Sequence, residues 1–150
     1  MDIVAQLKEY EGTKAYQMYK GSYKNSKFHV YKDSLGYDTI GYGHLVKADE
    51  AFPDGITEAQ ADAMLLADIG NARVEVDQLR LGLPFDSQWN DFMVLMVFQL
   101  GITKTNQFKK FLTALRAGNY ATAIAEVKDS NWYRQTPNRV NKMLDDVLKG

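Results

Sequence analysis

Residues 31–45 read YKDSLGYDTIGYGHL and combine two acids, hydroxyls, glycines and a histidine in one short aromatic segment. Asp33 and Ser34 favour a turn, and the residues after them are mostly β-favouring side chains. Gly41 and Gly43 interrupt this run, and a glycine inside a strand usually marks a bulge or the close approach of a ligand or another backbone. The segment therefore predicts an active-site hairpin.

The stretch before this hairpin is predicted to extend the same sheet. Aromatic and polar residues alternate over residues 14–44, which predicts a three-stranded antiparallel sheet. Turn-forming residues between positions 21 and 26 predict a hairpin tip at residues 19–28. A short helix is predicted over residues 2–10, because Ile3, Val4 and Leu7 share one face and Gly12 follows the end of the helix.

Helical periodicity dominates the rest of the chain. Thr57 and Gln60 form a capping-box pattern, and the apolar residues that follow are spaced by three and four, which predicts a long helix. Pro84 is predicted to end that stretch. Later helices are predicted over the apolar run that stops at Gly101 and over residues 105–117, 119–128 and 137–148.

These elements predict an α+β fold with a small antiparallel sheet lobe joined by a long helix to a larger all-helical lobe. The predicted single domain spans residues 1–150. Within it we expect a sheet lobe at about 12–56, a linking helix at about 57–80, and a helical lobe at about 85–150 that also contains the N-terminal helix 2–10.

Composition is that of a compact soluble protein. The chain has 150 residues, 45% of them hydrophobic, and it has no cysteine, which excludes disulfides and cysteine-based metal sites. Residues 1–12 lack the pattern of a secretory signal, and no transmembrane segment is expected. His29 and His44 have no neighbouring ligands at metal-binding spacing, so neither a metal nor a cofactor is expected.

Charge is distributed unevenly along the chain. Residues 1–103 hold 9 Lys and Arg against 15 Asp and Glu, a balance of −6, whereas residues 104–150 hold 9 against 4, a balance of +5. A basic C-terminal part suits an anionic polymer such as a bacterial wall or a nucleic acid, although a solvated helical surface explains it equally well.

An acid pair is the simplest chemistry in the N-terminal part. Hydrolysis of a glycosidic bond needs one carboxylic acid to protonate the leaving oxygen and a second carboxylate to attack or to activate water. Glu11, at a predicted helix end, and Asp33, in the hairpin, are candidates. Spacing alone is weak support, because the chain has 19 acids.

Several motifs in order resemble those of the phage-type lysozymes, the T-even endolysin family of glycoside hydrolases. They are Tyr10-Glu11-Gly12, the hairpin at 31–45, FMVLMVFQLG at 92–101 and NWYRQTPNR at 131–139. The chain departs from the family in a longer stretch between Glu11 and Asp33 and in a shorter connection after Leu45, changes that surface loops tolerate.

The resemblance implies a role for each residue of the acid pair. Glu11 would be the general acid, Asp33 would activate or orient a water, and Thr39 would help to hold that water. Inverting hydrolysis is implied, with the carboxyl groups roughly 6.5–9.5 Å apart. Arg139 matches the arginine that approaches the acid. Because a cation lowers a glutamate pKa, burial must oppose it if Glu11 is to stay protonated.

The resemblance also implies substrate contacts and one supporting pair. Leu45, Phe98 and Gln99 are expected to bind substrate. Phe111 and Glu126 fall on positions that are small or amide-bearing in the family, so sugar contacts there are expected to differ. His44 is expected to pair with Asp68, a carboxylate on the long helix.

The implied function is hydrolysis of peptidoglycan between N-acetylmuramic acid and N-acetylglucosamine during phage-induced lysis. The expected protein is a monomer that stays in the host cytoplasm until release and then acts on the wall in the periplasm. A separate membrane-permeabilising protein is implied for that release. The alternatives are a catalytically inactive wall-binding or virion-associated protein and, less favoured, a nucleic-acid-binding helical module; no nucleic-acid partner is expected.

Overall fold

The computed structural model describes residues 2–33, 36–84 and 86–149. Within them the fold is α+β, as predicted, and the chain divides into two compact units. We call residues 2–70 the sheet unit and residues 71–149 the helical unit, and describe each by itself. The prediction of a single domain over residues 1–150 stays a prediction. Ser34, predicted to help form the hairpin turn, lies outside the described residues.

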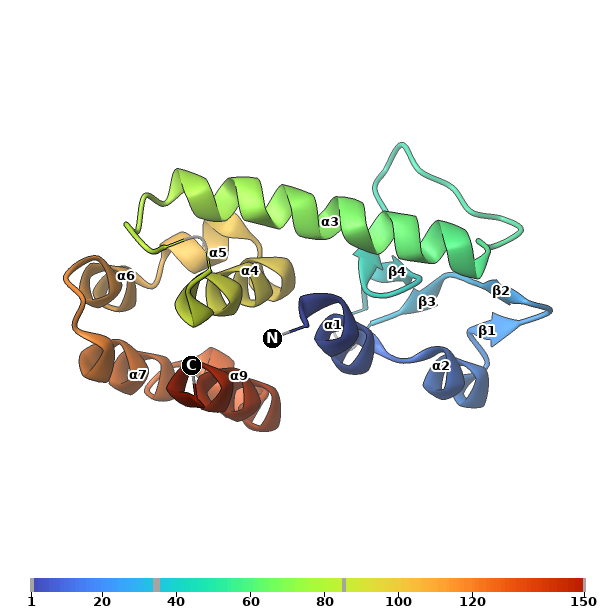
Figure 1. Cartoon of the computed structure of the whole chain (residues 1–150). Coiled ribbons are helices and arrows are strands. Elements are labelled where there is room, and N and C mark those ends of the chain that lie inside the picture. Colours follow the sequence, from blue (N-terminus) through green and yellow to red (C-terminus); the bar gives the residue numbers. More distant parts are fainter. Residues whose placement is uncertain (1, 34–35, 85, 150) are drawn as a thin grey trace. The chain divides into compact units, whose positions relative to one another are not determined.

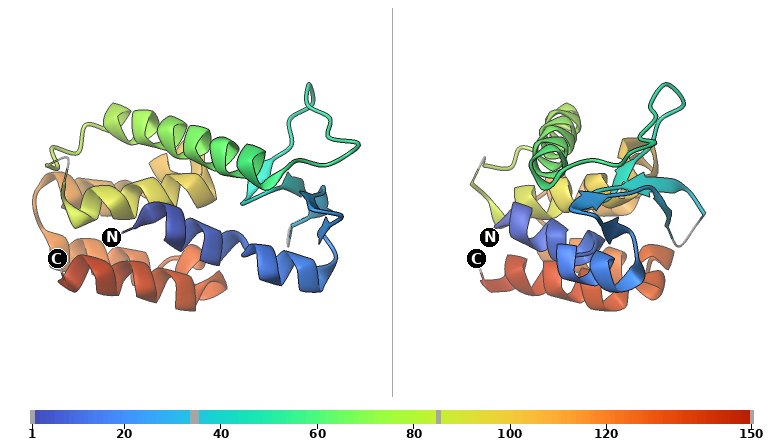
Figure 2. Two further views of the ribbon diagram at one scale, coloured as in Figure 1. Left: turned by 45° about the vertical axis from the view of Figure 1, so that its right-hand side comes forward. Right: turned by 90° about the vertical axis from the view of Figure 1, so that its right-hand side faces the viewer.

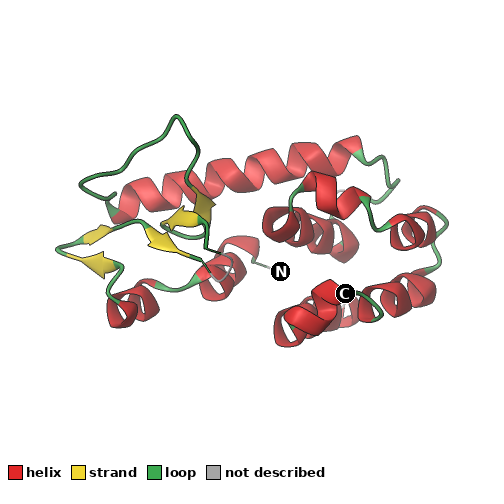
Figure 3. Cartoon of the chain, turned by 180° about the vertical axis from the view of Figure 1, so that it is seen from behind, coloured by secondary structure: helices red, strands yellow, loops and turns green. Residues whose placement is uncertain are grey.

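The sheet unit contains every strand of the described residues (Figure 3). Its elements are α1 (Ile3–Glu11), α2 (Lys14–Lys20), β1 (Tyr23–Lys24), β2 (Lys27–Phe28), β3 (Tyr31–Lys32), β4 (Asp38–Ile40), β5 (His44–Leu45) and the start of α3 (Glu58–Gln78). The strands form an antiparallel pair β1-β2 and an antiparallel sheet in the order β3-β4-β5.

The first helix forms as predicted. The Asp2 side chain caps α1 by accepting a hydrogen bond from the Ala5 backbone N–H at 3.1 Å. Ile3 and Leu7 are its buried face, and Gly12 with φ of 109° follows its last residue. Glu11 is therefore held at the end of a capped helix.

The segment at residues 14–20 was predicted to be a strand, and this prediction was wrong. Thr13 caps α2 by accepting from the Tyr16 N–H, and Gly21 ends it in the left-handed conformation at φ of 90°. Alternating aromatic and polar residues suggested a strand, but the caps and the burial of Gln17 favour a helix. The predicted three-stranded sheet exists further along the chain, at β3-β4-β5.

The predicted hairpin tip is confirmed in a shorter form. Asn25 and Ser26 both have positive φ, 53° and 61°, in the two-residue turn between β1 and β2. Such a turn matches the twist of the flanking strands. Figure 1 shows α2 leading into this hairpin.

A long connection without regular helix or strand runs from β5 to α3 (Figure 2). Ile56, near its end, bridges to Phe28 of β2. The predicted capping box then starts α3: the Thr57 N–H donates to the Gln60 side chain at 2.9 Å, and the Gln60 N–H donates to the Thr57 hydroxyl at 3.1 Å.

The long helix has the predicted apolar stripe. Leu65, Ile69, Ala72 and Val76 are all buried. It ends at Gln78, close to the predicted bound at about 80, and Arg80, two residues later, has a positive φ of 50°. The turn at residues 79–80 therefore ends the helix, before Pro84.

The helical unit consists of the rest of α3 and further helices. These are α4 (Gln88–Leu100), α5 (Ile102–Asn106), α6 (Lys109–Arg116), α7 (Tyr120–Lys128), α8 (Asn131–Gln135) and α9 (Pro137–Lys149). Residues 105–117 were predicted as one helix, but Gln107 and Phe108 separate two, and α8 was not predicted. Pro137 begins α9 as expected.

Aromatic rings pack around α4 in the core of this unit. The Phe92 ring, fully buried, has its centroid 5.1 Å from that of Trp89 and 5.9 Å from those of Phe111 and Trp132. Residues 92–97 of α4 are buried on every side of the helix. This helix is therefore the centre of the unit's core.

Candidate active site

The carboxylate of Glu11 lies directly against the glycine-rich hairpin. A Cβ added to Gly43 would lie 2.7 Å from Glu11 Oε2 and 2.8 Å from its Cδ and Cγ. Gly43 also has φ of 83°, a conformation that side chains disfavour. Glycine at position 43 thus leaves the space that the acid occupies, and the close approach predicted for the strand glycines is made by Glu11.

Tyr31 contacts the backbone of Glu11 and is affected electrostatically by both predicted catalytic acids. Its hydroxyl donates a long 3.5 Å hydrogen bond to the Glu11 backbone carbonyl. Burial raises the pKa of Tyr31 to about 12, and the charges of Glu11 and Asp33 add to this effect. Both predicted acids thus add to the effect of burial on one phenol.

Strand register places three side chains in a row next to Glu11. Tyr31 of β3 pairs with Thr39 of β4, and Thr39 pairs in turn with Leu45 of β5. Directly paired residues lie on the same face of a sheet. Leu45 is 55% exposed whereas Thr39 is only 3% exposed, so this row leads from solvent to a buried hydroxyl.

Asp33 is fixed by the backbone of the hairpin. Its Oδ1 accepts a hydrogen bond from the Tyr37 N–H at 2.9 Å, and its own N–H donates to the Tyr37 carbonyl at 2.9 Å. The Thr39 hydroxyl donates to the same carbonyl at 3.1 Å. Asp33 and Thr39 are thus positioned through one shared residue, and the Thr39 oxygen keeps its capacity to accept a hydrogen bond.

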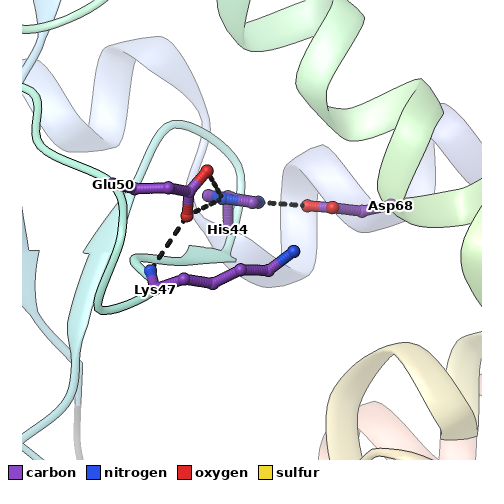
Figure 4. Close-up of polar contacts among 4 residues, drawn as sticks. All are labelled: His44, Lys47, Glu50 and Asp68. Carbon is purple, nitrogen blue, oxygen red and sulfur yellow. Dashed lines mark hydrogen bonds and ion pairs between the residues drawn. The ribbon is translucent and has the colours of Figure 1, made fainter.

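His44, the residue after Gly43, lies between two carboxylates (Figure 4). Its Nδ1 lies 2.8 Å from Asp68 Oδ2, which confirms the predicted contact, and its Nε2 lies 3.0 Å from Glu50 Oε1. Burial alone would lower the pKa of His44, but the hydrogen bonds and charges of Asp68 and Glu50 outweigh burial and raise it. The Lys47 N–H donates to Glu50 at 2.9 Å and, with His44, lowers the pKa of Glu50. The supporting role of this pair in catalysis stays a prediction.

The other predicted site residues belong to the helical unit. The Gln99 side chain accepts a 2.9 Å hydrogen bond from the Trp132 indole, and Phe98 is half-buried at the end of α4. Arg139 is half-buried in the first turn of α9. Phe111 is only 1% exposed within the aromatic core, so its burial favours a packing role over a sugar contact.

Glu126 lines a cavity on the surface formed by α6 and α7. The cavity has a volume of about 440 Å³. Besides Glu126 it is lined by Lys109, Lys110, Thr113, Ala114, Ala117, Asn119 and Thr122. Glu126 is thus half-buried among basic and hydroxyl-bearing side chains.

Two chemical features bear on cofactors and membranes. Among residues 2–33, 36–84 and 86–149, no three His, Cys, Asp or Glu side chains gather in a way that could hold a metal ion. In the same residues, no helix is long and apolar enough to cross a membrane.

Comparison with known proteins agrees with the geometry. The model of the phage lysozyme family matches residues 21–145, well over half of the chain. The chain belongs to the phage lysozyme family. Probable T4-type lysozyme 1 of Dictyostelium discoideum is 28% identical over 85% of this chain and 89% of the relative.

Two relatives of this phage lysozyme family member are much longer proteins. Peptidoglycan hydrolase gp36 of Pseudomonas phage phiKMV is 30% identical over 77% of this chain but only 13% of the relative. Pre-baseplate central spike protein Gp5 of Enterobacteria phage T4 is 26% identical over 81% of this chain and 25% of the relative. The chain is thus similar to a short part of two longer phage proteins with different descriptions.

The sequence analysis of this phage lysozyme family member missed three contributors to the site. Tyr31 was predicted only as part of the hairpin, although its strand pairing with Thr39 could have placed it in the site. Gly43 was flagged as a close-approach glycine, but its partner could not be named. Glu50 lies in an irregular loop where no periodicity points to His44.

Proposed function

We propose that this chain is a peptidoglycan hydrolase that cleaves the β-1,4 bond between N-acetylmuramic acid and N-acetylglucosamine. The observation that carries the proposal is the packing of the Glu11 carboxylate against Gly43, beside a hairpin that carries Asp33 and Thr39. Family membership supports the same chemistry, and the similarity to the peptidoglycan hydrolase gp36 supports the same polymer.

In the proposed mechanism Glu11 protonates the leaving glycosidic oxygen. Asp33 takes a proton from a water that Thr39 helps to hold by accepting its hydrogen bond. The water attacks the opposite face of the sugar, which inverts the anomeric carbon. Arg139 stays a proposed supporting residue. The matched family residues begin at position 21, so the assignment of Glu11 depends on its geometry and on the Tyr10-Glu11-Gly12 motif.

Leu45, Phe98 and Gln99 are proposed to bind substrate, and Glu126 is proposed to contribute from the α6 and α7 cavity. The role in the cell is also a proposal: a monomer made in the phage host, released to the periplasm with the help of a separate permeabilising protein. A virion-associated enzyme is the alternative, and the spike-protein relative is the observation that favours it.

Digestion of purified peptidoglycan tests the reaction. The wild-type protein should release fragments with a new N-acetylmuramic acid reducing end, and proton NMR should show the α-anomer first if the β bond is inverted. Glu11→Gln should lower the rate by roughly 10² to 10⁴ with an unchanged circular dichroism spectrum, and Asp33→Asn should also be severe. Near-normal digestion by folded Glu11→Gln would remove Glu11 as the acid. An inactive wild-type protein that still binds the wall would favour the wall-binding alternative.

A further inference from the structure

Helix α2 exposes its aromatic residues and buries an amide. Tyr16, Met18 and Tyr19 are 55%, 57% and 86% exposed, whereas Gln17 is 2% exposed. A surface helix normally places its apolar side chains inward. Reversals of such a local rule are expected at functional sites, so the outward face of α2 calls for a functional explanation.

Gln17 fixes the orientation of this helix through its side-chain amide. The amide nitrogen donates to the carbonyls of Gly12 and Gly41, each at 2.9 Å. The amide oxygen accepts a hydrogen bond from the Ser22 hydroxyl at 3.2 Å. The helix is therefore bound to the hairpin backbone by polar contacts, which leaves the rings of Tyr16 and Tyr19 for solvent or a ligand.

The exposed face of α2 is continuous with the candidate active site. A Cβ on Gly12, the residue after Glu11, would lie 3.5 Å from Cδ1 of Tyr16. Tyr16 also acts electrostatically on Tyr31, the phenol that Glu11 and Asp33 both influence. Tyr19 is three residues after Tyr16, so the two rings are neighbours on one helix face.

Two exposed lysines lie on or next to this helix. Lys20 ends α2 and Lys24 lies on β1, which packs against α2, and both are exposed. Lys14 has a different role, because its ammonium pairs with Glu58 at 3.1 Å. An aromatic face bordered by cations suits a polymer with apolar ring faces and negative groups.

We propose that Tyr16 and Tyr19 form a second binding surface for the glycan strand of peptidoglycan, on which sugar rings beyond the cleaved bond stack. Lys20 and Lys24 bind the carboxylates of its stem peptides. This inference rests on the proposed function for the identity of the polymer. Tyrosine suits such a surface because its rigid amphipathic ring gives a large contact area at low cost in conformational entropy.

Co-sedimentation with purified sacculi tests the surface, in a Glu11→Gln background so that the polymer persists. Tyr19→Ala should weaken binding roughly three- to tenfold and the Tyr16→Ala, Tyr19→Ala double variant further, as expected for loss of aromatic contacts. Tyr19→Phe should bind as the parent does. Leu66→Ala, which removes another exposed apolar side chain of the sheet unit, is the matched control and should also bind normally.

Two further probes separate the contributions and the rival ligands. Lys20→Gln and Lys24→Gln should weaken binding to intact sacculi. With sacculi stripped of stem peptides by an amidase, this effect should vanish, whereas the effect of Tyr19→Ala should persist. Unchanged binding by the double tyrosine variant would overturn the inference while leaving hydrolysis by the wild-type protein intact. Tyrosine-dependent binding to anionic phospholipid vesicles but not to sacculi would overturn it too. Tyrosine-dependent sacculus binding by a wild-type protein that cleaves nothing would refute the proposed hydrolysis and support this surface.

Discussion

The interiors of the two units differ in the kind of residue that they bury. The helical unit is organised by apolar packing around α4, where Trp89, Phe92 and Trp132 are all buried. In the sheet unit, by contrast, the buried residues include Gln17, Thr39 and His44, and each makes side-chain hydrogen bonds. Hydrophobic burial is non-directional, whereas a hydrogen bond fixes the orientation of the two groups that it joins. The candidate acids Glu11 and Asp33 lie in the sheet unit, which holds three of the four buried polar residues among the described ones; the fourth is Thr105.

The largest expected effect is on the stability of the helical unit. Phe92→Ala should lower the free energy of unfolding by about 3–5 kcal/mol, because the ring is fully buried among other aromatic rings. Urea unfolding monitored by tryptophan fluorescence measures it. Leu148→Ala, at a 68% exposed position, should change stability by less than about 0.5 kcal/mol. Equal effects of the two substitutions would contradict the assignment of α4 as the core.

The second effect is on the rate and probes the sheet unit. Gly43→Ala should place a methyl group where the Glu11 carboxylate lies. Because Glu11 is a flexible side chain it can move, so the fold should survive while wall digestion slows by about 10². Gly21→Ala is the control, since Gly21 has a similar positive φ of 90° with nothing within 4 Å of the added atom. If both variants lose the same activity, backbone strain and not displacement of Glu11 is the cause.

Sequence reasoning was most successful where structure depends on local patterns. The capping box at Thr57 and Gln60, the apolar stripe of α3 and the α+β fold class were all predicted correctly. These features depend on residues three or four positions apart, which a single sequence displays. The acid–hairpin arrangement was less accessible, because the contact between Glu11 and Gly43 joins residues far apart in the chain.

The failures have physical causes that particular residues show. Helix α2 was predicted as a strand because its exposed aromatics imitate alternation, while the decisive contact is between Gln17 and the distant Gly41 carbonyl. Glu50 was missed because it meets His44 from an irregular loop. In both cases the decisive contact is a side-chain hydrogen bond that the local periodicity does not predict.

The third prediction concerns that buried amide. Gln17→Met keeps the length of the side chain but leaves the Gly12 and Gly41 carbonyls without its donor, so stability should fall by about 1–3 kcal/mol. Chemical denaturation measures this loss. Gln78→Met, at an exposed position on α3, should be nearly neutral. A neutral Gln17→Met would show that polar contacts do not organise the sheet unit.

The smallest expected effect is a pH dependence of stability at His44. Its pKa is raised in the folded protein, so its contribution is complete below the unfolded pKa of about 6.5 and is lost as pH rises through the folded value. The pKa of Glu50 is lowered, so its contribution is present above about 4.3 and is lost as pH falls through its folded value. Both contributions are present together between these two limits.

Glu50→Gln should therefore cost about 1 kcal/mol near pH 5.5, the scale of one charge-assisted hydrogen bond. The cost should shrink once pH rises above the folded pKa of His44, because neutral imidazole no longer attracts the carboxylate electrostatically. Urea denaturation across that pH range measures both values, and Asp49→Asn, an exposed acid of the same loop, should show neither. A cost that does not change with pH would mean that Glu50 acts mainly through the Lys47 N–H, and that the histidine is held by Asp68 without help from the loop.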